Sequence, residues 1–200
     1  MPDTATPLLC LASASPRRTQ LLAQLGVAHR VAVADIDEAL LPEERAADYV
    51  LRMARAKALA VRARDATLPV LAADTTVVIE GQVCGKPRDA ADAVAMLGRL
   101  SGRTHQVLTA VALAGAAGLG LRLSASEVRF RTLTRAECQA YWDSGEPRDK
   151  AGGYAIQGRG AVFIEHLAGS YSGVMGLPLF ETAELLREAG VRYWPDGLGA

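Results

Sequence analysis

The stretch from Leu8 to Arg18, read as L-L-C-L-A-S-A-S-P-R-R, restricts the fold of this chain more than any other. Its apolar run, Leu8 to Ala12, has the length and the flanking residues of a buried strand. A short turn follows, in which Ser15 suits a helix N-cap and Pro16 suits the first helical position. The sequence therefore predicts a strand that turns at once into a helix.

Two adjacent arginines, Arg17 and Arg18, fall in the first turn of that helix. Cations are disfavoured there because the helix macrodipole is already positive at its N-terminus. Free backbone N–H groups, two hydroxyls and two guanidinium groups together fit a polyanion such as phosphate. The stretch alone leaves two interpretations open: an anion site, or a solvated helix start at which two arginines happen to stand.

Composition and charge exclude several classes of protein. The 200 residues suffice for one domain or for two small lobes that share a core. Lys+Arg and Asp+Glu balance at 22 each, so net charge gives no case for a nucleic-acid or anionic-membrane partner. No apolar run approaches the length of a membrane span. The N-terminus, Met1-Pro2-Asp3, lacks the basic region of a secretory signal.

The cysteines and histidines give no sign of a metal centre. Three widely separated cysteines predict small buried or neutral side chains in a reducing cytosol rather than a disulfide framework or a zinc site. They are Cys10, Cys84 and Cys138. The histidines, which show no metal-ligand spacing, are His29, His105 and His166.

A long helix is predicted from Pro42 to about Arg64, with an apolar stripe that includes Met53 and Val61. Lys57 falls on this stripe, four residues from each of them. Its ammonium group must either extend to solvent or meet an anion in a cleft. Just before this helix, the run Ala34 to Glu38 contains three carboxylates.

A buried strand, Val70 to Ala73, is predicted to run into Asp74-Thr75-Thr76 before strand character resumes at Val77. Interpreted by itself, Asp74 is a turn-forming aspartate. However, α/β proteins collect their chemistry at the ends of such strands. The alternative that Asp74 belongs to an active site therefore stays open.

The run Gly81 to Pro87 fails as a phosphate loop because its glycine spacing is one residue short and Pro87 replaces the metal-binding Ser/Thr. Lys86 within it can still contact a phosphate as a point charge. Next, Asp89 is expected to cap a helix. Two strands, Thr104 to Ala114 and Leu119 to Leu133, are then expected to pair around a G-A-A-G turn.

Thr134 and Glu137 have the spacing of a capping box. The following segment, Gly145 to Pro178, is rich in glycine and contains Gln157 and a short predicted strand, Val162 to Ile164. Glycine at this density favours tight turns and close backbone approach to a ligand. A flexible loop is the alternative, which the apolar and aromatic residues within the segment disfavour. A final amphipathic helix, Phe180 to Ala189, closes the core.

Six residues resist a purely structural explanation: Arg17, Arg18, Glu38, Lys57, Asp74 and Lys86. Four cations and two carboxylates fit metal-assisted phosphoryl chemistry. The cations would clamp phosphates and the carboxylates would hold Mg²⁺ or Mn²⁺. One carboxylate would also orient or deprotonate water.

Taken together, these motifs resemble the Maf family of nucleoside triphosphate pyrophosphatases, also called septum-formation inhibitors. The matching motifs are L-A-S-A-S-P-R-R, the Lys57 helix, A-A-D-T-T-V-V, G-K-P-R-D-A, L-S-G-R-T-H-Q-V-L-T-A-V-A, D-K-A-G-G-Y-A-I-Q-G and G-S-Y-S-G-V-M-G-L-P-L. They follow in order over nearly the whole chain. The resemblance implies a single domain over residues 1–200 with an α/β, Maf/ITPase-like fold. That fold has two lobes, a central mixed sheet flanked by helices, and a cleft between the lobes.

The resemblance also implies hydrolysis of a nucleoside triphosphate to the monophosphate and pyrophosphate, with Mg²⁺ or Mn²⁺. By position, Asp74 is similar to the family's proton acceptor, and Glu38 and Asp74 are similar to its metal-associated carboxylates. The residues that fall where the family handles phosphate are Ser13, Arg17, Arg18, Lys57 and Lys86. Arg17, Thr75 and Gln157 match the specificity positions of the subgroup that hydrolyses dTTP and UTP.

The family resemblance further implies a cytoplasmic homodimer that takes a nucleotide substrate and has no nucleic-acid or membrane partner. A second hypothesis is a nucleotide-binding regulator of cell division in which hydrolysis is secondary. The full set of candidate catalytic carboxylates and lysines favours the enzyme, because a pure binder would not need Asp74.

Overall fold

A computed structural model describes the chain from Thr6 to Trp194. Within that range the chain forms two compact units, each assembled from separate stretches. Unit 1 comprises residues up to 74 together with 109–124 and the stretch from 176 onward, and unit 2 comprises 75–108 and 125–175. The chain passes from one unit to the other within three long strands, β3 (Val70–Ile79), β5 (Thr104–Gly115) and β6 (Gly118–Phe130), and once more between Met175 and Gly176.

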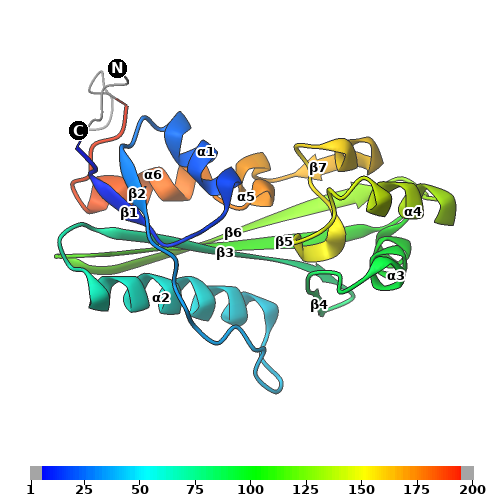
Figure 1. Cartoon of the computed structure of the whole chain (residues 1–200), viewed down its shortest axis with the longest axis horizontal. Coiled ribbons are helices and arrows are strands. Elements are labelled where there is room, and N and C mark those ends of the chain that lie inside the picture. Colours follow the sequence, from blue (N-terminus) through cyan, green and yellow to red (C-terminus); the bar gives the residue numbers. More distant parts are fainter. Residues whose placement is uncertain (1–5, 195–200) are drawn as a thin grey trace. The chain divides into compact units, whose positions relative to one another are not determined.

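Unit 1 begins with the predicted strand–turn–helix. Its elements are β1 (Leu9–Leu11), α1 (Pro16–Gln24), β2 (His29–Val31), α2 (Ala46–Arg64), the first part of β3, the second part of β5, the first part of β6 and α6 (Leu179–Glu188). β1 pairs in parallel with both β2 and β3, as in the registers Leu9↔His29 and Cys10↔Val70. The connections β1–α1–β2 and β2–α2–β3 therefore cross the sheet in opposite directions. Because such connections are right-handed, α1 and α2 must cover opposite faces, and Figure 1 shows them there.

Besides the rest of β3, β5 and β6, unit 2 contains the remaining elements. They are β4 (Gln82–Cys84), α3 (Ala90–Leu100), α4 (Arg135–Asp143), the 3-10 helices η1 (Ala151–Gly153) and η2 (Arg159–Phe163), β7 (Ile164–Ala168) and α5 (Tyr171–Met175). The predicted helix caps are confirmed: Asp89 Oδ1 accepts from Asp92 N at 2.8 Å, and Thr134 with Glu137 forms a full capping box. The strand order is β2-β1-β3-β5-β6-β7, and β4 pairs antiparallel with the end of β3. The predicted α/β class with a mixed sheet is confirmed.

The start of the long helix was predicted too early. α2 begins at Ala46, not at Pro42. Glu43 has a positive φ of 58°, which a helix does not tolerate. The carboxylate of Glu44 instead accepts from Leu41 N at 3.1 Å, so a turn precedes the helix.

Two strand predictions also need correction. No turn interrupts β3 at Asp74, because the strand is continuous from Val70 to Ile79 and stays buried on both sides of it. The strand predicted at Val162 to Ile164 begins only at Ile164, because Val162 belongs to η2. That start is set by pairing, since Ile164 is in register with Phe130 of β6.

The core of unit 2 contains a histidine, His105, that is 2% exposed. Its Nε2 lies 2.8 Å from the hydroxyl of Tyr154, and its ring packs edge-on against Phe130 at 5.0 Å. Its Nδ1 is buried with no hydrogen-bond partner among the described residues. Burial lowers the pKa of His105 from its ordinary 6.5 to about 4, because a charged imidazolium is poorly solvated there.

We expect His105 to make the protein less stable as the pH falls. Between pH 6.5 and about 4 the unfolded chain binds a proton at this residue and the folded chain does not. The free energy of unfolding should therefore fall across that window, by up to about 3 kcal/mol from this group. Urea denaturation of wild type and His105→Gln at several pH values measures this. The variant should show a flatter pH dependence, and equal slopes would contradict the assignment.

Candidate functional site

The centre of the candidate site is an ammonium group held between two carboxylates in unit 1. Lys57 Nζ on α2 lies 2.7 Å from Asp74 Oδ1 on β3 and 2.7 Å from Glu38 Oε1 in the loop before α2. Lys57 and Asp74 are 9% and 8% exposed, whereas half of the Glu38 side chain is exposed. Of the two interpretations of Lys57, extension to solvent is therefore wrong: the ammonium group is buried and pairs with two carboxylates of the chain itself.

A buried cluster of this kind usually adds little net stability to a fold. Removing two charges from water usually costs about as much free energy as their attraction returns. Buried charges that are kept nonetheless gather at functional sites more often than elsewhere. The half-exposed Glu38 leaves one side of the cluster open to solvent, so a ligand can reach it.

The arginine-bearing end of α1 adds cations to this cluster. Arg18 Nε donates to the carbonyl of Gly176 at 2.8 Å, and its Nη1 donates to Ser13 Oγ at 3.1 Å. Burial lowers the pKa of Arg18, while the charges of Asp74 and Glu38 act in the opposite direction. The carboxylates of Asp74 and Glu38 therefore interact electrostatically with the Arg18 guanidinium group.

The N-terminus of α1 has the local structure of an anion site. Ser15 is the N-cap of α1, as predicted, and has the extended backbone of that position, although its side chain makes no capping hydrogen bond. Ser13 Oγ instead accepts from Ser15 N at 3.2 Å and from Arg18. With Arg17 and Lys57 included, the cluster carries three cations and two carboxylates, and its net positive charge suits a phosphate chain.

Tyr49 is a residue near the site that the sequence prediction missed. Its hydroxyl donates to the carbonyl oxygen of Glu38 at 3.0 Å. Burial, together with the charges of Asp74 and Glu38, raises the pKa of Tyr49 to about 12. A signal was available, because Tyr49 precedes Met53 by four residues and therefore continues the stripe that contains Lys57.

Arg52, one turn further along α2, fastens the same loop. Its guanidinium group forms a two-point ion pair with the Glu44 carboxylate, with both N–O distances at 2.6 Å. It also donates to the carbonyl of Ala39 at 2.9 Å. The loop that carries Glu38 is thus tied to α2 at Tyr49 and at Arg52, which limits the positions that Glu38 can take.

The carboxylates fit a divalent cation that is bound jointly with a substrate. In residues 6–194 no group of three or more His, Cys, Asp or Glu side chains is placed to hold a metal ion. Mg²⁺, however, is commonly held by one or two carboxylates together with substrate phosphates and water. Glu38 and Asp74, which converge on one ammonium group, meet that requirement.

Unit 2 contains the other three predicted residues: Thr75, Lys86 and Gln157. Thr75 is half-buried on β3, whereas Lys86 and Gln157 are exposed. The loop that carries Lys86 is fixed to the glycine-rich segment, because Gly152 N donates to Gly85 O at 3.0 Å. A Cβ on Gly152 would lie 2.7 Å from Val77 Cγ2, and its φ is positive, so only glycine allows this approach.

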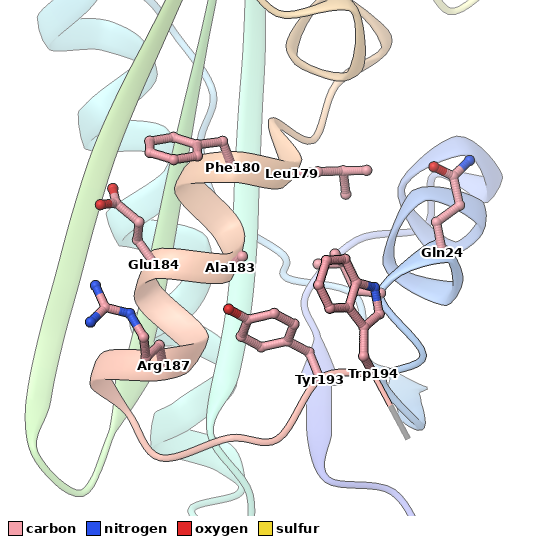
Figure 2. Close-up of a pocket in the computed structure, with 9 residues that line it drawn as sticks. Gln24, Leu179, Phe180, Ala183, Glu184, Arg187, Tyr193 and Trp194 are labelled. Carbon is pink, nitrogen blue, oxygen red and sulfur yellow. The ribbon is translucent and has the colours of Figure 1, made fainter. Parts of the chain in front are cut away.

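A separate pocket in unit 1 contains none of the predicted site residues. It has a volume of about 590 Å³ and is lined by Gln24, Leu25, Leu179, Phe180, Ala183, Glu184, Arg187, Tyr193 and Trp194. Figure 2 shows Phe180 and Glu184 along α6, with Gln24 of α1 across from them and the rings of Tyr193 and Trp194 between. A wall this rich in aromatic and apolar atoms offers little to a triphosphate. The charge cluster around Lys57 is therefore the better candidate for a phosphate site.

The chain belongs to the Maf family. The family model described as "Maf-like protein" matches residues 8–189. Among curated proteins, a "dTTP/UTP pyrophosphatase" of Hahella chejuensis is 54% identical over 94% of this chain and 95% of its own length. A protein of the same name from Methylobacillus flagellatus is 55% identical over 90% of this chain and 92% of its own length.

A solved structure, described as that of the Staphylococcus aureus Ham1 protein, is 13% identical with a TM-score of 0.44. The match covers 61% of this chain and 71% of the Ham1 chain. As for membranes, none of the helices described for this chain is both long and apolar enough to span one.

Proposed function

We propose that this protein is a nucleoside triphosphate pyrophosphatase that hydrolyses dTTP and UTP to the monophosphate and pyrophosphate. The observation that carries the proposal is the Glu38–Lys57–Asp74 cluster beside the arginine-bearing end of α1. The proposal is supported by the family match. It is also supported by two relatives that are named for this activity and that align with this chain over nearly their whole length.

The cations bind and orient the phosphate chain. Arg17 and the positive end of the α1 dipole suit the phosphate oxygens. Arg18, fixed by Gly176 and Ser13, holds the turn that presents them. Lys57 adds an ammonium group inside the cluster, and Lys86 adds a point charge from its own loop. Charge that grows on the phosphate oxygens during the reaction is stabilised by groups already in place.

Asp74 is the proposed general base. Its carboxylate is held by Lys57 at 2.7 Å within a rigid, buried strand, so its oxygens point in a fixed direction. It would orient a water molecule for attack on the phosphate chain and accept its proton. Glu38, with half of its side chain exposed, would complete the carboxylate pair. When Mg²⁺ or Mn²⁺ is bound to Glu38 and Asp74, it supplies neutralisation of the negative charge on the phosphates.

Selection of the base needs other groups, because all triphosphates are alike at the phosphates. Gln157 offers both a donor and an acceptor on one amide, and it is exposed between the buried Ile156 and the half-buried Gly158. Thymine and uracil present two carbonyls and an N–H that an amide can pair with. Thr75, adjacent to Asp74 in the chain, is the second proposed specificity residue.

A nucleotide panel tests this proposal. We expect the wild type to turn over dTTP and UTP with a higher kcat/KM than dCTP, dATP, GTP or 7-methyl-GTP, as measured by pyrophosphate release with Mg²⁺ and with Mn²⁺. A preference for a purine nucleotide would contradict the proposed substrate class. Nucleotide binding without pyrophosphate release would favour the regulator hypothesis instead.

Gln157→Ala is expected to reduce the preference for dTTP over dATP more than it reduces the maximal rate. Loss of the amide leaves the pyrimidine edge without a partner, whereas the phosphate-binding and hydrolytic groups remain. The measurement is kcat/KM for dTTP and dATP on both proteins. An unchanged ratio in the variant would remove Gln157 from base selection but leave the hydrolytic activity standing.

We also propose that the enzyme works as a cytoplasmic homodimer, as the family resemblance implies. Size-exclusion chromatography coupled to light scattering measures the mass of the protein in solution directly. Twice the chain mass of 21.1 kDa supports the dimer, and a single chain mass contradicts it.

A further inference from the structure

Two side chains of unit 2, Tyr141 and Glu146, accept hydrogen bonds from the backbone on both sides of Gln157. The hydroxyl of Tyr141, at the end of α4, accepts from Ala155 N at 3.0 Å and donates to Glu146 Oε1 at 2.7 Å. Glu146 Oε1 also accepts from Gly160 N at 3.1 Å, and its Oε2 accepts from Arg159 N at 2.9 Å. One tyrosine–glutamate pair thus holds the segment two residues before Gln157 and again two and three residues after it.

The segment is built to wrap closely around this pair. A Cβ on Gly158 would lie 2.4 Å from Glu146 Oε2, and a Cβ on Gly160 would lie 2.6 Å from Tyr141 Oη. These glycines are therefore needed for the approach of the backbone to the carboxylate and the phenol. They explain part of the glycine richness that the sequence shows between Gly145 and Pro178.

Gln157 is more exposed than the tyrosine and the backbone that hold its segment in place. Tyr141 and Ala155 are each 5% exposed, whereas Gln157 is exposed. Burial opposes ionisation of Glu146, but hydrogen bonds from Tyr141, Arg159 and Gly160 outweigh it and lower the pKa of that carboxyl. The acceptor therefore stays a carboxylate at neutral pH, and it is strong enough to fix three donors.

We propose that Tyr141 and Glu146 are positioning residues for base selection, which fix the backbone on both sides of Gln157 and so set the direction of its amide. This inference rests on the proposed function. Hydrogen bonding to a base edge discriminates between bases only if the donor and acceptor are held in place. An amide on a loose loop could turn to suit any base, and the preference for pyrimidines would be lost.

The test compares kcat/KM for dTTP with kcat/KM for dATP in Tyr141→Phe and Glu146→Gln. A ratio of two substrates does not depend on how much of the enzyme is correctly folded, so simple loss of structure does not change it. We expect the ratio to fall about tenfold, mainly through a higher KM for dTTP, while kcat for dTTP changes less. An unchanged ratio in both variants would overturn the inference.

Two control variants separate positioning from stability and charge. Thr134→Ala removes the N-cap of α4 but none of the hydrogen bonds of Tyr141 and Glu146. It should lower the melting temperature but keep the ratio of kcat/KM for dTTP to that for dATP. Glu165→Gln removes a carboxylate of unit 2 whose partner is Arg129, at 3.0 Å, and it should also keep the ratio. A fall of the ratio in these controls equal to that in the test variants would overturn the inference.

Tyr141→Phe decides the matter if Glu146→Gln does not fold. It removes one oxygen and keeps the ring, which packs edge-on against Phe163 at 5.0 Å. If the wild type prefers dTTP and Gln157→Ala loses that preference while Tyr141→Phe keeps it, the inference fails and the proposed function stands. If the wild type releases no pyrophosphate from any nucleotide, the proposed function itself fails.

Discussion

Asp74→Asn is expected to lower kcat for dTTP about 10²–10⁴-fold while nucleotide binding survives, the usual effect of losing a general base. Asparagine keeps the shape of aspartate but cannot accept a proton or neutralise a metal ion. Its amide oxygen can still accept from Lys57, which lies 2.7 Å from Asp74 Oδ1. Lys57, the proposed phosphate contact, should therefore stay in place.

The measurement combines pyrophosphate release with the affinity for a non-hydrolysable dTTP analogue, determined by calorimetry. Asp92→Asn is the matched control, because it removes a carboxylate that is paired with Arg88 on the exposed side of α3. The control should keep near-normal kcat. Near-normal turnover by a folded Asp74→Asn protein would remove Asp74 from the mechanism.

Lys57→Ala is expected to lower kcat/KM about 10²–10³-fold, or about 3–4 kcal/mol of transition-state stabilisation. Lys57 is the cation that both carboxylates share, at 2.7 Å from each. Its loss would remove the proposed phosphate contact and also leave Asp74 and Glu38 to repel each other. Because Glu38 is half exposed, we expect that repulsion to be relieved by a shift of its side chain, without unfolding.

Arg55→Ala is the control for Lys57, because it removes an exposed cation from the same helix and also places alanine there. Thermal melting of both variants accompanies the kinetics. Full activity in Lys57→Ala would contradict the proposed phosphate contact. A loss of activity that only follows a loss of folded protein would contradict it equally.

Much of the fold could be predicted from the sequence because its signals are local. Pro16 marks the start of α1, and Thr134 with Glu137 marks the start of α4, since caps act within one helical turn. The tight turn between β3 and β4 is local in the same way, because Glu80 and Gly81 adopt positive φ values of 52° and 76°. Each of these choices is settled by neighbours in the chain.

The errors arose where distant residues decide. A continuous β3 through Asp74 depends on partners that are remote in sequence, and local turn propensity pointed the other way. The turn that precedes α2 is also held by a residue outside it, because Glu44 pairs with Arg52 in the following helix. For the same reason Lys57 could be recognised as unusual from the apolar stripe, whereas its two partners were visible only in the structure.

The candidate site shows the same division. The residues predicted around Lys57 are brought together in unit 1, because the strand–helix units of this fold end near one another. Tyr49, Arg52, Tyr141 and Glu146 were not predicted. They act through backbone atoms of segments distant in the chain, as in the hydrogen bond from Ala155 N to Tyr141. Contacts of this kind leave no spacing pattern in a single sequence.

The most direct test of the central claim is to identify the products of dTTP hydrolysis by ³¹P NMR with wild type and with Asp74→Asn. The account predicts one dTMP and one pyrophosphate for each dTTP consumed by the wild type, in the presence of Mg²⁺ or Mn²⁺. It predicts almost no product from the variant over the same time. Formation of dTDP and inorganic phosphate, or equal product from both proteins, would contradict it.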